Sequence, residues 1–115
     1  MEVKVSEKEH GVSVIAPVGS IDSNTYAELE KQAESVLAKK PKIIVLDMSG
    51  VDYIGSVGIR VMMTAKKKIE NSGGAFMVAG LQPNVRNVFD ILHLIPLVNI
   101  FSSVVEAEES LVGRQ

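Results

Sequence analysis

The sequence contains no cysteine and no tryptophan, and it has only two tyrosines and three phenylalanines among 115 residues. The absence of cysteine excludes disulfides, thiolate metal ligands and thiol nucleophiles, and it fits a reducing compartment. With so few aromatic side chains, the core must consist mainly of Val, Ile, Leu, Met and Ala. The hydrophobic fraction of 46% is sufficient for such a core. We therefore expect one domain over residues 1–115.

Several other features are also missing. The net charge is −2, and no basic stripe with interleaved aromatic residues occurs, which argues against nucleic-acid binding. The first ten residues, MEVKVSEKEH, alternate and are charged, unlike a secretory signal. No apolar run approaches the roughly 20 residues of a membrane helix. These absences predict a cytoplasmic protein that is not inserted in a membrane.

Sequence motifs of common enzymes are absent as well. There is no G-x-x-x-x-G-K-[ST], and Gly55–Gly58 is too short for a dinucleotide fingerprint. His10 and His93 have no partners at metal-ligand spacing. A triad of Ser56, His93 and an aspartate is conceivable, but the G-x-S-x-G elbow is missing. We expect no catalytic residue, no metal and no cofactor.

Apolar periodicity alternates between strand and helix along the chain. Pro17 in the second strand favours an edge or a bulge, and Thr25 with Glu28 forms a capping-box signature. The order β-β-α-β-α-β-α-β-α predicts an α/β fold with a mostly parallel or mixed sheet of about five strands and four helices. The predicted strands are 3–5, 12–18, 43–46, 75–79 and 97–101, and the predicted helices begin near Tyr26, Ser56, Pro83 and Val104.

Ser56 follows a buried strand and a polar turn, at the predicted mouth of a helix. The flanking glycines leave its hydroxyl open to a partner, and the helix N-terminus favours a phosphate there. The plainer interpretation is an N-cap, typically worth about 1 kcal/mol. Asp22, Asp47 and Asp52 lie after strand ends, where they suit Mg²⁺ or a phosphate donor. We favour the alternative in which these carboxylates organise turns.

Short motifs along nearly the whole chain resemble those of the bacterial anti-sigma factor antagonist family, whose domain is called STAS. Their order and spacing over about a hundred residues make the resemblance specific. The motifs are Gly19-Ser20-Ile21-Asp22, Asp47-Met48-Ser49, Tyr53-Ile54 before the phosphorylation loop, Gly80-Leu81-Gln82-Pro83-Asn84-Val85, and Glu106-Ala107 at the start of the last helix.

In that family the loop usually reads Asp-Ser-(Ser/Thr/Ala)-Gly, and a partner kinase phosphorylates the first serine. The resemblance implies that Ser56 is the phosphoacceptor and that Gly58 is the family's glycine. Two residues depart from the pattern, since Gly55 replaces the aspartate and Val57 replaces a small or hydroxylated residue. We expect the partner-binding surface to comprise Asp22, Ser23, Asn24, Gly55, Ser56, Val57, Gly58 and Ile59.

The resemblance implies a binding switch and no enzymatic activity. The expected function is that of an anti-sigma factor antagonist, which binds an anti-sigma factor serine kinase when unphosphorylated and so frees a sigma factor. Phosphorylation of Ser56 would switch it off, and a PP2C-type phosphatase would reset it. We expect a monomer or a weak dimer. The alternative is a non-catalytic STAS subunit of a lipid-transport ATPase or a stress-sensing complex, without a phosphoswitch. An enzyme that binds a small molecule or nucleotide is the least favoured interpretation.

Overall fold

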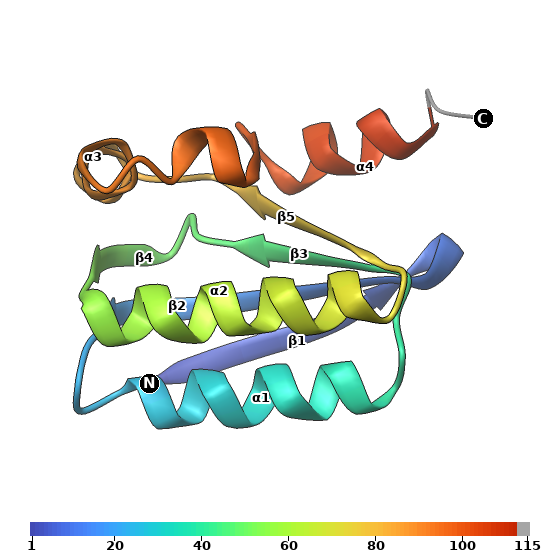
Figure 1. The fold of residues 1–115 in the computed structure, drawn as a ribbon, viewed down its shortest axis with the longest axis horizontal. Coiled ribbons are helices and arrows are strands. Elements are labelled where there is room, and N and C mark those ends of the chain that lie inside the picture. The colour runs from blue at the N-terminus through green and yellow to red at the C-terminus, as the bar shows by residue number, and fades with distance from the viewer. Residues whose placement is uncertain (113–115) are drawn as a thin grey trace.

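The computed structural model describes residues 1–112, which form a mixed sheet with helices on both faces (Figure 1). The sheet order is β1-β2-β3-β5-β6, and β4 pairs with β2 beside this path. Among residues 1–112, only the β1–β2 pairing is antiparallel. The α/β class and the mostly parallel sheet are therefore as predicted. The strands are β1 (Glu2–Lys8), β2 (Val12–Ile21), β3 (Ile43–Asp47), β4 (Val51–Ile54), β5 (Ala75–Ala79) and β6 (Asn99–Phe101).

The helices begin where the sequence predicts them. They are α1 (Tyr26–Ala38), α2 (Ser56–Asn71), α3 (Pro83–Ile91) and α4 (Val104–Val112), with 3₁₀ turns at Glu9–Gly11 and Ile95–Leu97. Helices α1 and α2 lie side by side and begin at the same end of the sheet (Figure 1). Within residues 1–112, no helix is both long enough and apolar enough to cross a membrane.

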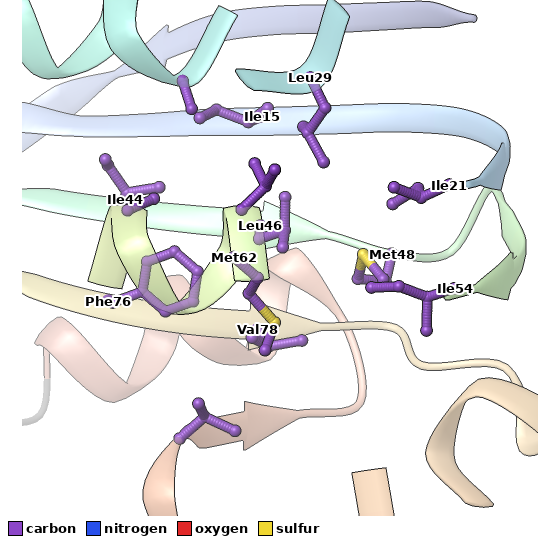
Figure 2. Close-up of a cluster of buried hydrophobic side chains, with 14 of the residues drawn as sticks. Ile15, Ile21, Leu29, Ile44, Leu46, Met48, Ile54, Met62, Phe76 and Val78 are labelled. Carbon is purple, nitrogen blue, oxygen red and sulfur yellow. The ribbon is translucent and has the colours of Figure 1, made fainter. Parts of the chain in front are cut away.

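The core has two parts, one on each face of the sheet. The larger part fills the space between the sheet and helices α1 and α2, where Leu29 and Met62 meet strand residues such as Leu46 (Figure 2). On the other face, Val14, Val45 and Met77 pack with Ala107 of α4. Alternate residues of β3 thus point to opposite faces, and the strand is apolar on both because helices cover both.

The strands differ from the prediction in two places: β4 makes a sixth strand, and β6 begins at Asn99 because Leu97 belongs to a 3₁₀ turn. The sequence predicts a turn at Asp52, whereas this residue lies inside β4. β4 pairs in parallel with the last residues of β2, which follow the part of β2 that pairs with β3. Pro17 lies between these two pairings and needs no N–H on that side, and a register shift follows at Gly19. β2 is an interior strand, and its irregularity lies between Gly19 and Ser20, two residues beyond the predicted position at Pro17.

Candidate functional site

Strands β2 and β4 end side by side and bring two loops together. Ile21 is the register partner of Ile54, and the Gly55 N–H donates to the Ile21 carbonyl at 2.8 Å. The residues that follow each strand therefore start from neighbouring positions at the same edge of the sheet. The loop after β2 contains Ser23 and Asn24, and the chain after β4 leads directly into α2. Parallel pairing thus joins the two halves of the surface predicted from the sequence.

The first turn of α2 presents Ser56 to solvent. Gly55 occupies the N-cap position with extended backbone (φ −93°, ψ 178°), and Ser56 is the first helical residue. The interpretation of Ser56 as the N-cap is therefore wrong. Its side chain is exposed, and among residues 1–112 its hydroxyl takes part in no hydrogen bond. A hydroxyl of this kind at a helix N-terminus is accessible to a second protein, and it does not stabilise the fold through a hydrogen bond.

Gly58 holds this end of α2 close to the sheet. A Cβ at this position would lie 2.6 Å from Cγ2 of Ile21 and 2.8 Å from Cγ1 of Ile54. Both isoleucines stand at the ends of their strands and are buried (Figure 2). The contacts leave no room for a side chain, because core packing tolerates no such overlap. Gly58 is therefore needed for packing, because it lets the start of α2, with Ser56, lie close to the sheet.

The loop before α1 is organised by Asp22 and Thr25. The Asp22 carboxylate accepts a hydrogen bond from the Asn24 N–H at 2.9 Å, which closes an Asx turn. The Thr25 hydroxyl donates to the Ser20 carbonyl at 2.7 Å and accepts from the Asp22 N–H at 2.9 Å. Because this hydroxyl is occupied, the predicted capping box with Glu28 does not form. Ser23 and Asn24 remain exposed beside the start of α2.

The other two aspartates also bind neighbouring polar groups. Asp47 accepts hydrogen bonds from the N–H and hydroxyl of Ser49, at 3.0 and 2.7 Å. Asp52 accepts from the Ser20 hydroxyl at 2.8 Å and so links β4 to β2. In the part of the chain that the structure describes, no three His, Cys, Asp or Glu residues form a group that could hold a metal ion. These contacts favour the structural interpretation of the aspartates.

The hypothetical triad is not assembled. His93 lies just beyond α3, exposed and with a left-handed backbone (φ 56°), and within residues 1–112 no hydrogen bond joins it to Ser56. Ser49 also differs from Ser56, because its hydroxyl already donates to Asp47. Among these groups, Ser56 is the one whose hydroxyl is both exposed and uncommitted.

The surface predicted from the sequence leaves out Tyr53, Arg60 and Tyr26, and of these only Tyr53 was indicated, as part of a family motif. Tyr53 is 52% exposed on β4, and its hydroxyl lies near the space above Gly55. Arg60 lies over the ring of Tyr26 with its guanidinium carbon 5.7 Å from the ring centroid. The spacing of four residues between Ser56 and Arg60 is the one sequence signal for their shared helix face. With half-buried Val57 and Ile59, these residues make a mixed apolar and polar surface suited to protein contact.

The family model of the STAS domain matches residues 4–107, and the chain belongs to this family. BtrV of Bordetella bronchiseptica is 28% identical over 111 residues, which cover 94% of this chain and 96% of BtrV. RsfB of Mycobacterium tuberculosis, an anti-sigma-F factor antagonist, is 37% identical over 71 residues, 61% of this chain and 58% of RsfB. The crystal structure of an anti-sigma factor antagonist from Mycobacterium paratuberculosis superposes with a TM-score of 0.86 at 28% identity, covering 95% of this chain and 92% of that one.

Proposed function

We propose that this protein is an anti-sigma factor antagonist that is switched by phosphorylation of Ser56. The observation that carries the proposal is the exposed, uncommitted Ser56 hydroxyl at the first turn of α2. Its surroundings are those of a STAS domain similar along most of its length to proteins named as such antagonists. The fold brings the loop after β2 and the start of α2 together, so a partner can contact both at once.

In the unphosphorylated state, this surface docks on an anti-sigma factor that is also a serine kinase. The docking residues are those predicted above, from Asp22 to Asn24 and from Gly55 to Ile59. Bound in this way, the antagonist displaces the sigma factor from its inhibitor. Half-buried Val57 and Ile59 supply apolar contact, and exposed Ser23 and Asn24 supply hydrogen-bonding groups at the rim.

The phosphoryl transfer needs only an accessible hydroxyl from this chain. The kinase brings ATP and Mg²⁺, and its own base takes the proton of the Ser56 hydroxyl as the oxygen attacks the γ-phosphorus and ADP leaves. Gly55, which replaces the family's aspartate, adds no side chain beside this oxygen. Val57 replaces a small or hydroxylated residue, so the loop offers one acceptor and a more apolar rim. The protein is proposed to be a substrate and a ligand, and to have no enzymatic activity.

Phosphorylation would break the complex without unfolding the protein. The phosphate adds about −1.5 to −2 charges at neutral pH. The free amide groups and dipole at the start of α2 tolerate that charge. In the interface, the same charge would be desolvated against the partner's nucleotide or acidic groups, at a cost of several kcal/mol. Since about 1.4 kcal/mol is already a tenfold loss of affinity, one phosphate suffices. A PP2C-type phosphatase would restore binding.

Calorimetric titration of three forms against a candidate anti-sigma kinase tests the switch. Ser56→Ala should bind as well as the wild type, because it removes only a hydroxyl. Ser56→Asp should lose at least about tenfold in affinity, because it places a charge in the interface. Circular dichroism should show both variants folded.

The matched control is Ser6→Asp, which adds the same charge on exposed β1, opposite Val14 and far from the end of β2. It should bind normally. Equal binding by the Ala and Asp variants of Ser56 would overturn the phosphoswitch. The alternative, a STAS subunit of a larger assembly, would then be the better account.

A further inference from the structure

Arg60 lies one helical turn after Ser56, on the same face of α2. Residues four apart on a helix are neighbours, about 5–6 Å between their Cβ atoms. The Cα–Cβ bonds of a helix tilt toward its N-terminus, so the stem of Arg60 leans toward the turn that contains Ser56. The Arg60 side chain is 57% exposed. A group attached to the Ser56 oxygen therefore comes within reach of the guanidinium.

The present partners of Arg60 hold it weakly, and both lie on α1. Its Nη1 is 3.8 Å from Oε2 of Glu30, longer than the 2.7–2.9 Å of a charge-assisted hydrogen bond. The guanidinium also stacks over Tyr26, the first residue of α1. Because α1 and α2 begin side by side, this places the charge near the end of the helix pair where Ser56 lies (Figure 1). Exposed ion pairs of this kind contribute little to stability.

We propose that Arg60 is the intramolecular partner of the phosphate on Ser56, and that phosphorylation draws it away from Glu30 and Tyr26. This inference rests on the proposed phosphorylation of Ser56. A phosphate carries up to twice the charge of the Glu30 carboxylate and has three strong acceptor oxygens. The planar fork of a guanidinium matches two of these oxygens at once, so the phosphate outcompetes a carboxylate that is not hydrogen-bonded to it.

This rearrangement would extend the effect of one modification across two helices. When Arg60 moves to the phosphate, the Glu30 carboxylate loses its counter-charge and the ring of Tyr26 becomes uncovered. A partner docked on this end of the molecule would then meet a changed α1 as well as the phosphate. Arg60 is thus a positioning residue for the phosphorylated state.

The test uses the full chain with phosphoserine installed at position 56 during translation, so that no kinase is needed. The pKa of the phosphate monoanion is measured by ³¹P NMR titration. Loss of the cation in Arg60→Gln should raise this pKa by roughly half a pH unit, a modest shift because the site is exposed. Arg60→Lys should raise it less. The other charged groups at this end are Asp22 after β2, Asp52 on β4 and Glu30 on α1, and they are present in every form that is compared.

The matched control is Lys67→Gln, which removes one positive charge from an exposed position on the same helix. It lies eleven residues, about 16 Å, beyond Ser56, further than the screening length of about 8–10 Å. It should leave the phosphate pKa unchanged. The ¹⁵N signal of the Arg60 side chain should shift when unmodified and phosphorylated wild type are compared.

Equal phosphate pKa values in the wild type and Arg60→Gln, or an Arg60 signal that does not respond to phosphorylation, would overturn the inference. A kinase that fails to modify Ser56 would contradict the proposed function and leave this result standing, because the phosphate is installed without it. The two failures are therefore distinguishable.

Discussion

The two glycines that flank the Ser56 hydroxyl differ in what they require of the chain. Gly55 has negative φ, and a Cβ there would be 3.4 Å from the Tyr53 hydroxyl, an ordinary contact. Gly58 has no space for a Cβ against Ile21 and Ile54. The sequence predicted that glycines leave Ser56 open. The distance between α2 and strands β2 and β4 decides which glycine can be replaced by a larger residue. The spacing of apolar residues in the sequence does not predict this distance.

Gly55→Asp should leave the free energy of unfolding within about 1 kcal/mol of the wild type and raise it by a few tenths, because Asp is a slightly better N-cap than Gly. Gly58→Ala is the matched control. Overpacking should lower the free energy of unfolding by about 1–3 kcal/mol. The higher helix propensity of alanine should offset at most about 1 kcal/mol of this loss. Urea unfolding of both variants measures the difference.

Similar losses of stability in the two variants would show that Gly55 belongs to the backbone scaffold. With a cognate kinase, Gly55→Asp should alter the rate of Ser56 phosphorylation more than it alters stability, since residue 55 adjoins the acceptor. An unchanged rate with a large shift in melting temperature would contradict this assignment.

Two helices of this protein start with the same sequence signature, and at α4 the serine makes the capping bond while the glutamate reaches the residue before the cap. At α1 the hydroxyl of Thr25 is occupied by the end of β2. At α4 the Ser103 hydroxyl accepts from the Glu106 N–H at 3.1 Å, and the Glu106 carboxylate accepts from the N–H and hydroxyl of Ser102. The pattern Ser/Thr-x-x-Glu is thus not sufficient for a cap, because a nearby strand can take the capping hydroxyl first.

The start of α4 should respond to acid. The hydroxyl and then the N–H of Ser102 hold the pKa of Glu106 below its ordinary value of 4.5. The pKa of Glu106 is lower in the folded than in the unfolded protein. Its ionised carboxylate therefore stabilises the fold above pH 4.5, and this stabilisation is lost as the pH falls through the folded pKa. Glu106→Gln should therefore be less stable than the wild type at neutral pH, and the difference should disappear on acidification.

Urea midpoints at neutral pH and at about pH 3 measure this loss. Glu109→Gln, an exposed position on the same helix, should show no pH-dependent difference. A Glu106→Gln variant that stayed equally destabilised at both pH values would show that the carboxylate charge is not what matters.

Across the whole molecule, the two faces of the sheet are covered unequally. Helices α1 and α2 cover the face with the larger core. On the opposite face, α4 packs against β3, β5 and β6, with Ala107 fully buried beside Val45 and Met77. Partner recognition is proposed at the strand ends, so α4 supports the fold without taking part in the proposed site. Substitutions in the buried face of α4 should therefore lower the free energy of unfolding without directly changing the proposed partner-binding surface.

Ala107→Glu should destabilise the protein by at least about 2 kcal/mol, because it forces an unpaired carboxylate against a closed apolar surface. Val105→Glu adds the same side chain at a position on the same helix that is 64% exposed, and it should stay within about 0.5 kcal/mol. Urea unfolding, with binding of a hydrophobic dye to detect an uncovered sheet face, measures both. Equal stability of the two variants would mean that α4 does not hold that face closed.

The sequence alone determined the class of fold, the starts of all four helices and the position of Ser56 at the mouth of α2, because apolar periodicity, glycine and proline act over a few neighbouring residues. The short motifs also indicated the STAS family. The tertiary structure decided the rest. Pairing of β4 with β2, the close approach of Gly58 to Ile21 and the position of Arg60 over the ring of Tyr26 all join residues more than thirty positions apart. Such contacts depend on which groups the folded chain brings within bonding distance, and no local pattern specifies them.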